Sequence, residues 1–172
     1  ADERVTPELS REIREKINSD SFRGYYNPRR NYFLGRWIRY SGWWPDHTLR
    51  LFRKDVSHME EREVHEKIIV NGPVGYITAP FEHYTYRTVS DYLKKMENYS
   101  SLSAKEMNHK SVFSAFCSML FSPLIVFIKM YVLRQGFRDG IHGYILAVLY
   151  SFYTFLKYLK VLENRGTLNG RL

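Results

Sequence analysis

Two short segments place an imidazole beside a carboxylate, a combination that serves proton transfer and metal binding. In residues 64–66, Glu66 could act as a general base if a hydroxyl nucleophile lay within hydrogen-bond reach. Neighbouring residues of a strand point to opposite faces, so His65 and Glu66 share one task only if a loop holds them. In residues 82–84, His83 could project as a metal ligand. A lone histidine is more often structural, so spacing alone leaves both readings open.

A basic and aromatic segment, residues 22–54, is the second candidate for chemistry. Its charges are seven arginines and one lysine against the single acid Asp46: Arg23, Arg29, Arg30, Arg36, Arg39, Arg50, Arg53 and Lys54. Tyrosine, phenylalanine and tryptophan residues alternate with them, Trp43 and Trp44 included. This mixture suits single-stranded nucleic acid. It equally suits a phosphate-bearing saccharide, because guanidinium groups grip phosphate oxygens. A solvated strand face over an aromatic core explains the same pattern without a ligand.

Composition limits the class of protein. The chain has 172 residues, 44% hydrophobic and 16% aromatic, which fits one folded domain with an appendage and excludes a disordered chain. The single cysteine, Cys117, excludes an intramolecular disulfide framework and a cysteine-based zinc cluster. The net charge of +8 predicts an anionic partner: nucleic acid, a membrane surface or a phosphorylated substrate.

The charges divide the chain after Lys110. Residues 1–111 hold 19 basic and 16 acidic side chains, whereas residues 112–172 hold 7 and 2. The second part has two apolar segments, 112–133 and 141–156, and a spanning helix needs about 20 apolar residues. Spanning helices, helices lying in the membrane interface and core helices of a larger enzyme all remain possible. Pro123 and the short second segment favour in-plane binding over spanning.

Elements that would position these residues can be read from local signals. Thr6 and Pro7 predict the start of a helix with Leu9, Ile13 and Ile17 on one face. We predict a turn at 25–28, strands within 31–40, 48–53 and 74–78, and a loop at 42–46. A further helix should start near residue 88 or 90, with its apolar face formed by Val89, Tyr92, Leu93, Met96, Tyr99 and Leu102.

Taken together, the segments resemble one enzyme family. Residues 1–9 are similar to the stretch of family 2 glycosyltransferases that begins at their Asp-x-Asp motif, usually Asp-Ala-Asp-Glu-Arg; Asp2 matches its last aspartate. Six further segments recur in the order of the bacterial branch resembling lipopolysaccharide-core glucosyl- and heptosyltransferases: Asn31–Arg36, Gly42–Asp46, Arg50–Arg53, Val64–Glu66, His83–Tyr86 and Gly136–Gly140. The resemblance covers residues 1–163 and implies a C-terminal portion of a longer protein.

The resemblance implies a fold and a location. Residues 1–110 would form the acceptor-side half of an α/β GT-A, Rossmann-like domain, and residues 111–172 an α-helical membrane-associated tail. The protein would work at the cytoplasmic face of the inner (plasma) membrane. Its partners would be a nucleotide-sugar donor, a lipopolysaccharide-core or other lipid-linked glycan acceptor and an anionic membrane surface, with no nucleic acid. The alternative is a non-catalytic basic-aromatic binding module with a membrane anchor.

The resemblance also implies roles for single residues. The reaction would invert the anomeric carbon, with Mg²⁺ or Mn²⁺ offsetting charge on the departing diphosphate. Asp2 and His83 would hold that metal, and Glu66 would accept the proton of the acceptor hydroxyl. His65 would orient Glu66 or contact the diphosphate. The remaining expected substrate-binding residues are Trp43, Trp44 and Asp46 in an acceptor loop, and Arg50 and Arg53, one of which reaches phosphate.

Overall fold

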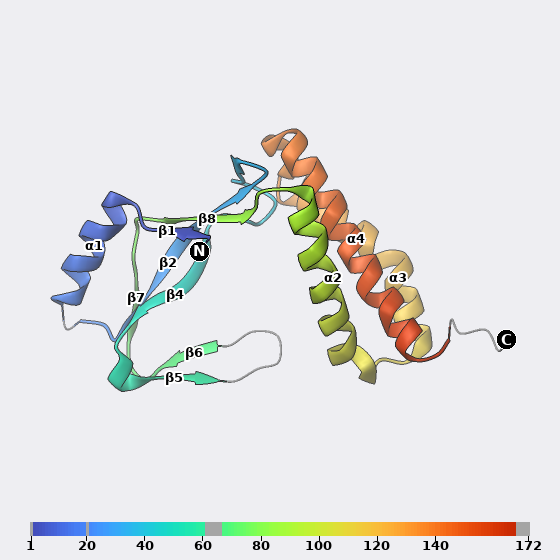
Figure 1. The fold of residues 1–172 in the computed structure, drawn as a ribbon, viewed down its shortest axis with the longest axis horizontal. Helices are drawn as coiled ribbons and strands as arrows, with labels where there is room; N and C mark the ends of the chain where they lie inside the picture. The colour runs from blue at the N-terminus through green and yellow to red at the C-terminus, as the bar shows by residue number, and fades with distance from the viewer. Residues whose placement is uncertain (1, 20, 61–66, 168–172) are drawn as a thin grey trace. The chain divides into compact units, whose positions relative to one another are not determined.

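A computed structural model of the chain describes residues 2–19, 21–60 and 67–167 (Figure 1). It divides into two compact units, residues 1–87 and 88–172. The first unit contains β1 (Glu3–Arg4), α1 (Pro7–Ile17), β2 (Gly24–Phe33), β3 (Arg36–Trp37), β4 (Asp46–Phe52), the 3-10 turn η1 (Lys54–Val56), β5 (Ser57–Glu60), β6 (Lys67–Val70), β7 (Val74–Tyr76) and β8 (Phe81–Tyr86). The second contains α2 (Val89–Glu106), η2 (Met107–His109), α3 (Val112–Phe127), the π-helical η3 (Ile128–Leu133), η4 (Gly136–Asp139) and α4 (Ile141–Asn164).

Strand β2 organises the first unit. It pairs with β8 and β7 in parallel and with β4 and β3 antiparallel, while β1 pairs antiparallel with the far side of β8. Strands β5 and β6 form a separate hairpin. This mixed sheet with helices is an α/β arrangement compatible with a partial Rossmann-like fold. The expected α/β class is therefore confirmed at this coarse level.

The predicted turn at residues 25–28 is wrong, because β2 runs straight through it. A proline is tolerated in this central strand for a reason visible in the pairing. The Tyr26 carbonyl accepts from the Ile77 amide on the β7 side, so the backbone groups of residue 28 point to that side as well. The β7 and β8 pairings cover residues 24–26 and 29–33, so residue 28 faces the gap between them. Pro28 thus removes a donor that the ladder does not use.

Helix α1 packs on the sheet and begins as predicted, with Thr6 as the N-cap and Pro7 in the first turn. Its Leu9 is 1% exposed and joins the core cluster of Tyr25, Ile77 and Phe81, with Ile13 packed against it. Ile17 is 64% exposed, so the predicted apolar face ends one turn earlier than expected. The Glu12 carboxylate accepts hydrogen bonds from the backbone amides of Thr78 and Ala79 and from the Thr78 hydroxyl. Glu12 therefore ties the helix to the segment between β7 and β8.

In the second unit, α4 packs against both α2 and α3. Helix α2 starts at the predicted place, where Thr88 and Asp91 form a reciprocal capping box. Its buried residues are Tyr92, Met96, Ser100 and Ala104, a strict four-residue stripe. The predicted apolar face is therefore only partly right, since Val89, Leu93, Tyr99 and Leu102 are exposed. The division between the compact units falls before α2, whereas the composition changes after Lys110.

Lys160 of α4 shows how α2 is held. Its ammonium group donates to the Glu97 carboxylate at 2.7 Å and lies 2.8 Å from both the Ser100 and Ser101 hydroxyls. The side chain is only 16% exposed. Tyr92 of α2 also packs near Tyr150 of α4. Through these contacts the polar helix α2 packs along residues 150–160 of α4.

The two apolar segments both form helices: residues 112–133 (α3 and η3) and α4, which extends to Asn164 rather than ending at 156. Both are long and apolar enough to cross a membrane, by length and composition only. A tight turn joins them. Gly143 of α4 lies so close to Gly136 that an added Cβ would stand 1.9 Å from the Gly136 carbonyl oxygen and 3.1 Å from Cβ of Asp139.

Candidate functional site

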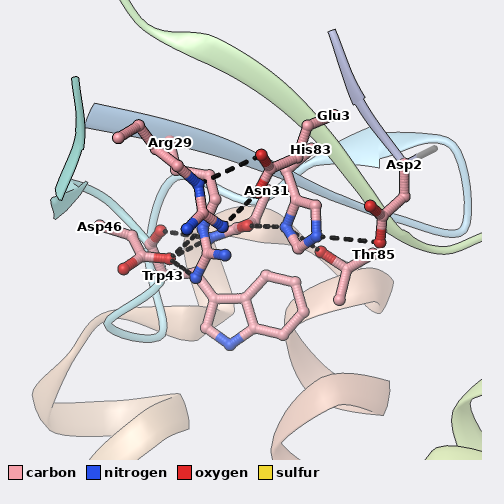
Figure 2. A network of polar contacts seen from close by, with 9 residues as sticks. Asp2, Glu3, Arg29, Asn31, Trp43, Asp46, His83 and Thr85 are labelled. Atoms are coloured by element: carbon pink, nitrogen blue, oxygen red, sulfur yellow. Dashed lines mark hydrogen bonds and ion pairs between the residues drawn. The ribbon is translucent and has the colours of Figure 1, made fainter. Parts of the chain in front are cut away.

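An imidazole and a carboxylate meet where β1 pairs with β8. Glu3 lies opposite His83 in the ladder, and the Tyr84 amide donates to the Asp2 carbonyl at 2.8 Å. This pairing brings Asp2 Oδ2 to 3.3 Å from His83 Nε2 (Figure 2). The expected metal ligands, 81 residues apart in sequence, are therefore neighbours because two short strand segments are hydrogen-bonded.

Asn31 of β2 fixes the protonation of the imidazole. Its amide nitrogen donates to Asp46 Oδ2 at 2.8 Å, and a carboxylate there can only accept. The Asn31 oxygen therefore faces His83 Nδ1, at 2.7 Å. That oxygen needs a donor, so Nδ1 carries the proton, which the Thr85 hydroxyl oxygen also approaches at 2.9 Å. In the neutral ring, Nε2 is left with its lone pair toward Asp2.

The surroundings favour this neutral ring. Burial lowers the pKa of His83, and the nearby Arg29 guanidinium lowers it further, although Asp2 and Glu3 act in the opposite direction. The net pKa lies below the usual value of 6.5. This lowered pKa favours the uncharged imidazole at neutral pH.

Two lone-pair donors at this distance fit a shared cation. Ligand atoms about 2.1 Å from a metal and at right angles to each other lie about 3 Å apart. The 3.3 Å separation of Asp2 Oδ2 and His83 Nε2 is close to that value. The hydrogen bond at Nδ1 is the outer contact that orients ligating histidines in metalloproteins. In the part of the chain that the structure describes, no group of three His, Cys, Asp or Glu residues is assembled.

The loop before β4 joins the same network. Asp46 accepts from Arg29 Nε at 2.8 Å and from Asn31, so its carboxylate is held between two β2 side chains. The Trp43 carbonyl accepts a longer bond, 3.4 Å, from the Asn31 amide. The Trp43 ring packs edge-on against Phe33, with centroids 6.2 Å apart. Asp46 and Trp43 thus shape the site, and both lie close to the imidazole's hydrogen-bond partner.

The other expected substrate-binding residues lie at different distances from this network. Arg50 pairs with Glu3, with 2.8 Å between its Nη2 and Oε1 of Glu3, which places its guanidinium beside the β1–β8 pairing. The Trp44 ring packs edge-on against the Trp37 ring, with centroids 5.4 Å apart. Arg53 follows the end of β4, 3.6 Å from Asp55, and is not part of the Asp2–His83 network among the described residues. The predicted catalytic residues, His65 and Glu66, lie outside the described residues.

Sequence reasoning gave no role to the residues that orient the pair: Arg29, Asn31 and Thr85. A usable signal was present, since Arg29 and Asn31 alternate along a strand and so share one face. The incorrect turn at residues 25–28 obscured that alternation. Thr85 stands two residues after His83 on β8 and follows the same rule.

The class of structure defined here is an α/β domain, compatible with a partial Rossmann-like fold, that carries an oriented histidine–carboxylate pair. No protein-family model matches the chain, and no solved structure matches it significantly. The chain is 28% identical over 174 residues to the lipopolysaccharide core biosynthesis glycosyltransferase LpsC of Rhizobium meliloti (strain 1021). The match covers 96% of this chain and 63% of the relative. This similarity supports a relationship to a glycosyltransferase.

Proposed function

We propose that the chain is the acceptor-side part of a family 2, GT-A glycosyltransferase. It would transfer a sugar, with inversion, from a nucleotide sugar to a lipopolysaccharide-core or other lipid-linked glycan at the cytoplasmic face of the inner membrane. The observation that carries the proposal is the similarity to LpsC along 96% of the chain. The oriented Asp2–His83 pair supports it independently, because nucleotide-sugar chemistry needs charge neutralisation at a diphosphate.

In this proposal Asp2 and His83 hold Mg²⁺ or Mn²⁺ together with donor phosphates. Mg²⁺ sites typically use one or two carboxylates plus substrate phosphates, so a two-residue protein contribution is sufficient. The bound ion would stabilise the negative charge that develops on the departing diphosphate. Asn31 keeps the His83 lone pair available by holding the proton on Nδ1. Arg50, tied to Glu3 beside the pair, is the better placed of the two expected arginines for contact with phosphate.

The acceptor side of the proposal rests on the loop at 42–46 and on Glu66. Trp43 and Asp46 lie next to Asn31, so an acceptor held by this loop would lie beside the Asp2–His83 pair. Glu66 would take the proton of the acceptor hydroxyl, and His65 would orient it or contact the diphosphate.

Metal binding and transfer can be tested in parallel. The chain is titrated with Mn²⁺ while the line broadening of the Asn31 side-chain amide resonances, next to His83, is followed by NMR, and release of nucleoside diphosphate is measured with lipopolysaccharide as acceptor. Asp2→Asn and His83→Ala should each weaken Mn²⁺ binding, Asp2→Asn more severely because it also removes charge. Asp55→Asn removes an exposed carboxylate elsewhere and is the matched control.

Selective, saturable broadening lost in the two site variants would support the metal assignment. Equal broadening in wild type, Asp2→Asn and His83→Ala would refute it. The acceptor-side part alone is expected to be inactive, because it lacks the donor-binding half. Absence of sugar transfer from every common nucleotide sugar in a longer protein that contains that half and binds Mn²⁺ normally would instead favour the non-catalytic binding module.

The helical unit supplies the membrane part of the proposal. The segment 112–133 exposes a nearly continuous apolar surface: Phe113, Phe116, Leu120, Phe121, Leu124, Ile125, Ile128, Val132 and Leu133. Exposed apolar patches of this kind mark interaction surfaces in soluble proteins and membrane contact in peripheral ones. Lys129, Arg134 and Arg138 are exposed among or beside these residues and would meet lipid phosphates, each contributing about 1 kcal/mol at an anionic surface.

The position of α2 favours in-plane binding over a spanning hairpin. Lys160 and Tyr150 hold α2 along residues 150–160 of α4, so a hairpin crossing the bilayer would draw the charged Lys94 and Lys95 of α2 toward the hydrocarbon. Lying in the interface, α3 can enter the lipid while α2 stays in water. Charged groups at bilayer depth cost about 2.5–3.5 kcal/mol each, and this cost supports in-plane binding.

Liposome flotation tests this orientation. Leu124→Asp, on the exposed face of α3, should reduce binding to anionic vesicles about tenfold or more. Leu102→Asp, on the exposed face of α2, should leave it within about twofold, because that side remains in water. High salt or carbonate should release the wild-type chain. Retention until detergent is added would refute in-plane binding, and equal loss in both variants would refute the assignment of α3 as the inserted face.

A further inference from the structure

A depression lies on the other face of β8 from His83. Consecutive strand residues point to opposite faces, and the contacts follow that rule: His83 meets Asn31, whereas Tyr84 stacks on Tyr32. The depression has a volume of about 280 Å³. It is lined by Arg4, Tyr32, Gly35, Tyr84, Tyr86 and Arg87. This volume is near the lower limit for small-ligand sites, about 300 Å³, and fits one substituted sugar ring.

Side chains on three adjacent strands hold the Arg4 guanidinium group of this depression in one orientation. Strands β1, β8 and β2 are neighbours in the sheet (Figure 1), and they carry Arg4, Tyr84 and Tyr32, respectively. The two tyrosine rings are stacked, with centroids 4.7 Å apart and planes at 15°. The Arg4 guanidinium carbon lies 5.0 Å from the Tyr84 ring centre. Because Tyr32 occupies one face of that ring, Arg4 covers the other, and the stack fixes its orientation before any ligand arrives.

The carboxylate of Glu82, beside these tyrosines, already accepts two hydrogen bonds. Glu82 accepts from the Tyr84 hydroxyl at 2.9 Å and from the Tyr32 hydroxyl at 3.3 Å, one at each oxygen. Glu82 is not among the residues that line the depression. Within the described residues, neither Arg4 nor Arg87 forms an ion pair with a carboxylate. Two positive charges therefore border one depression without a paired acid.

Arg4 and Arg87 both line this depression. Their like charges repel each other, and a dianion bound between them would be attracted by both.

Gly35 keeps the depression open. It forms the β2–β3 turn with Leu34, and both have positive φ, 80° and 50°, as a two-residue type I′ hairpin requires. A Cβ built on Gly35 meets no atom within 4 Å, so the glycine borders free space.

We propose that this depression binds the phosphate group of a phosphorylated sugar or of a nucleotide, gripped between Arg4 and Arg87. Guanidinium forks match phosphate oxygens in pairs, which makes arginine the usual residue for this task. The site is distinct from the Asp2–His83 pair, and the inference does not depend on sugar transfer, since it concerns binding alone. A phosphorylated sugar and a nucleotide would present the same kind of phosphate group to the two arginines, and the experiment distinguishes these two ligands.

The test is an NMR titration of the full chain at 150 mM salt with EDTA present, so that no metal at Asp2 and His83 contributes. Glucose 6-phosphate and uridine diphosphate are the probes, glucose is the neutral control, and shifts of the Tyr32 and Tyr84 rings are followed. Arg4→Gln and Arg87→Gln should each weaken binding about tenfold. Arg14→Gln, an exposed arginine on α1, removes the same charge and should stay within about twofold.

The outcomes are distinct. Arginine-dependent binding of glucose 6-phosphate alone identifies a sugar phosphate, and binding of uridine diphosphate alone identifies a nucleotide. Binding of neither probe, or equal binding of glucose, refutes the site. If a glutamine variant unfolds, Arg4→Lys with Arg87→Lys keeps the charge but loses the fork, and should retain weakened binding. Unchanged affinity in that double variant would also refute it. Failure of sugar transfer leaves all these results interpretable.

Discussion

The amide of Asn31 joins the acceptor loop to the imidazole, and its removal is the sharpest test of the site. Asn31 is 6% exposed and bridges Asp46 and His83. Asn31→Leu keeps the size of the side chain but removes its hydrogen bonds to Asp46 and His83 and the longer one to the Trp43 carbonyl. A bond to a charged group contributes about 1.5–3 kcal/mol and a neutral one about 0.5–1.5 kcal/mol. Asp46 keeps its ion pair with Arg29 at 2.6 Å, so we expect a loss of about 2–4 kcal/mol in the free energy of unfolding.

The assay can isolate the first unit. All three tryptophans of the chain, Trp37, Trp43 and Trp44, lie in residues 1–87, so tryptophan fluorescence during urea denaturation reports this unit alone. Asn71→Ala is the control, because Asn71 is exposed in the turn between β6 and β7. It should change the free energy of unfolding by less than about 0.5 kcal/mol.

A second measurement follows the proton itself. In the wild-type chain, ¹⁵N shifts should show His83 protonated on Nδ1 and unprotonated on Nε2, because Asn31 offers only its oxygen. Asn31→Leu should lose this preference. The reasoning is refuted if the substitution costs less than about 0.5 kcal/mol, or if the proton resides on Nε2 in the wild-type protein.

Three further predictions use other contacts. Burial raises the pKa of Glu12, but hydrogen bonds from the segment after β7 outweigh it and leave the pKa below 4.5. The ionised Glu12 carboxylate therefore stabilises the fold above pH 4.5, and this stabilisation is lost as pH falls through the lower, folded-state pKa. Glu12→Gln should lower the free energy of unfolding at pH 7 and make it less dependent on pH in the acid range. Exposed Glu15→Gln should have neither effect. Lys160→Met should lower the thermal midpoint of the helical unit, by circular dichroism, more than Lys94→Met, because it leaves the buried Ser100 hydroxyl without the Lys160 donor. Glu66→Gln in a transfer-competent protein should reduce turnover about 10²–10⁴-fold with donor binding retained; wild-type turnover would exclude Glu66 as the base.

Local signals predicted the helix starts well, because capping chemistry is contained within four residues. Thr6 with Pro7, and Thr88 with Asp91, mark the two starts without reference to the rest of the chain. The strand through Pro28 could not be predicted in the same way. Its tolerance depends on a gap between two other strands that pair with β2, and that gap exists only in the assembled sheet.

The candidate site likewise has one part that the sequence predicted and one part that depends on the assembled fold. Resemblance placed Asp2 and His83 together, and the structure brings them to 3.3 Å through the β1–β8 ladder. The orientation of the pair depends on Asn31, a residue with no acid–base chemistry of its own. Asn31 matters because its amide nitrogen contacts the Asp46 carboxylate, which turns its oxygen toward His83. Composition and spacing do not predict that contact.

The close approach of Gly143 to Gly136 has a consequence for sequence variation. Where a Cβ would lie 1.9 Å from a carbonyl oxygen, even alanine forces the backbone of the helical turn to move. The α3–α4 connection should therefore behave as an all-or-none position in a library of variants: selection for a folded chain would retain glycine at 143. The exposed apolar residues of α3 a few turns away would exchange freely among Leu, Ile, Phe and Val. Such a library would separate geometric constraint from hydrophobic constraint within a single hairpin.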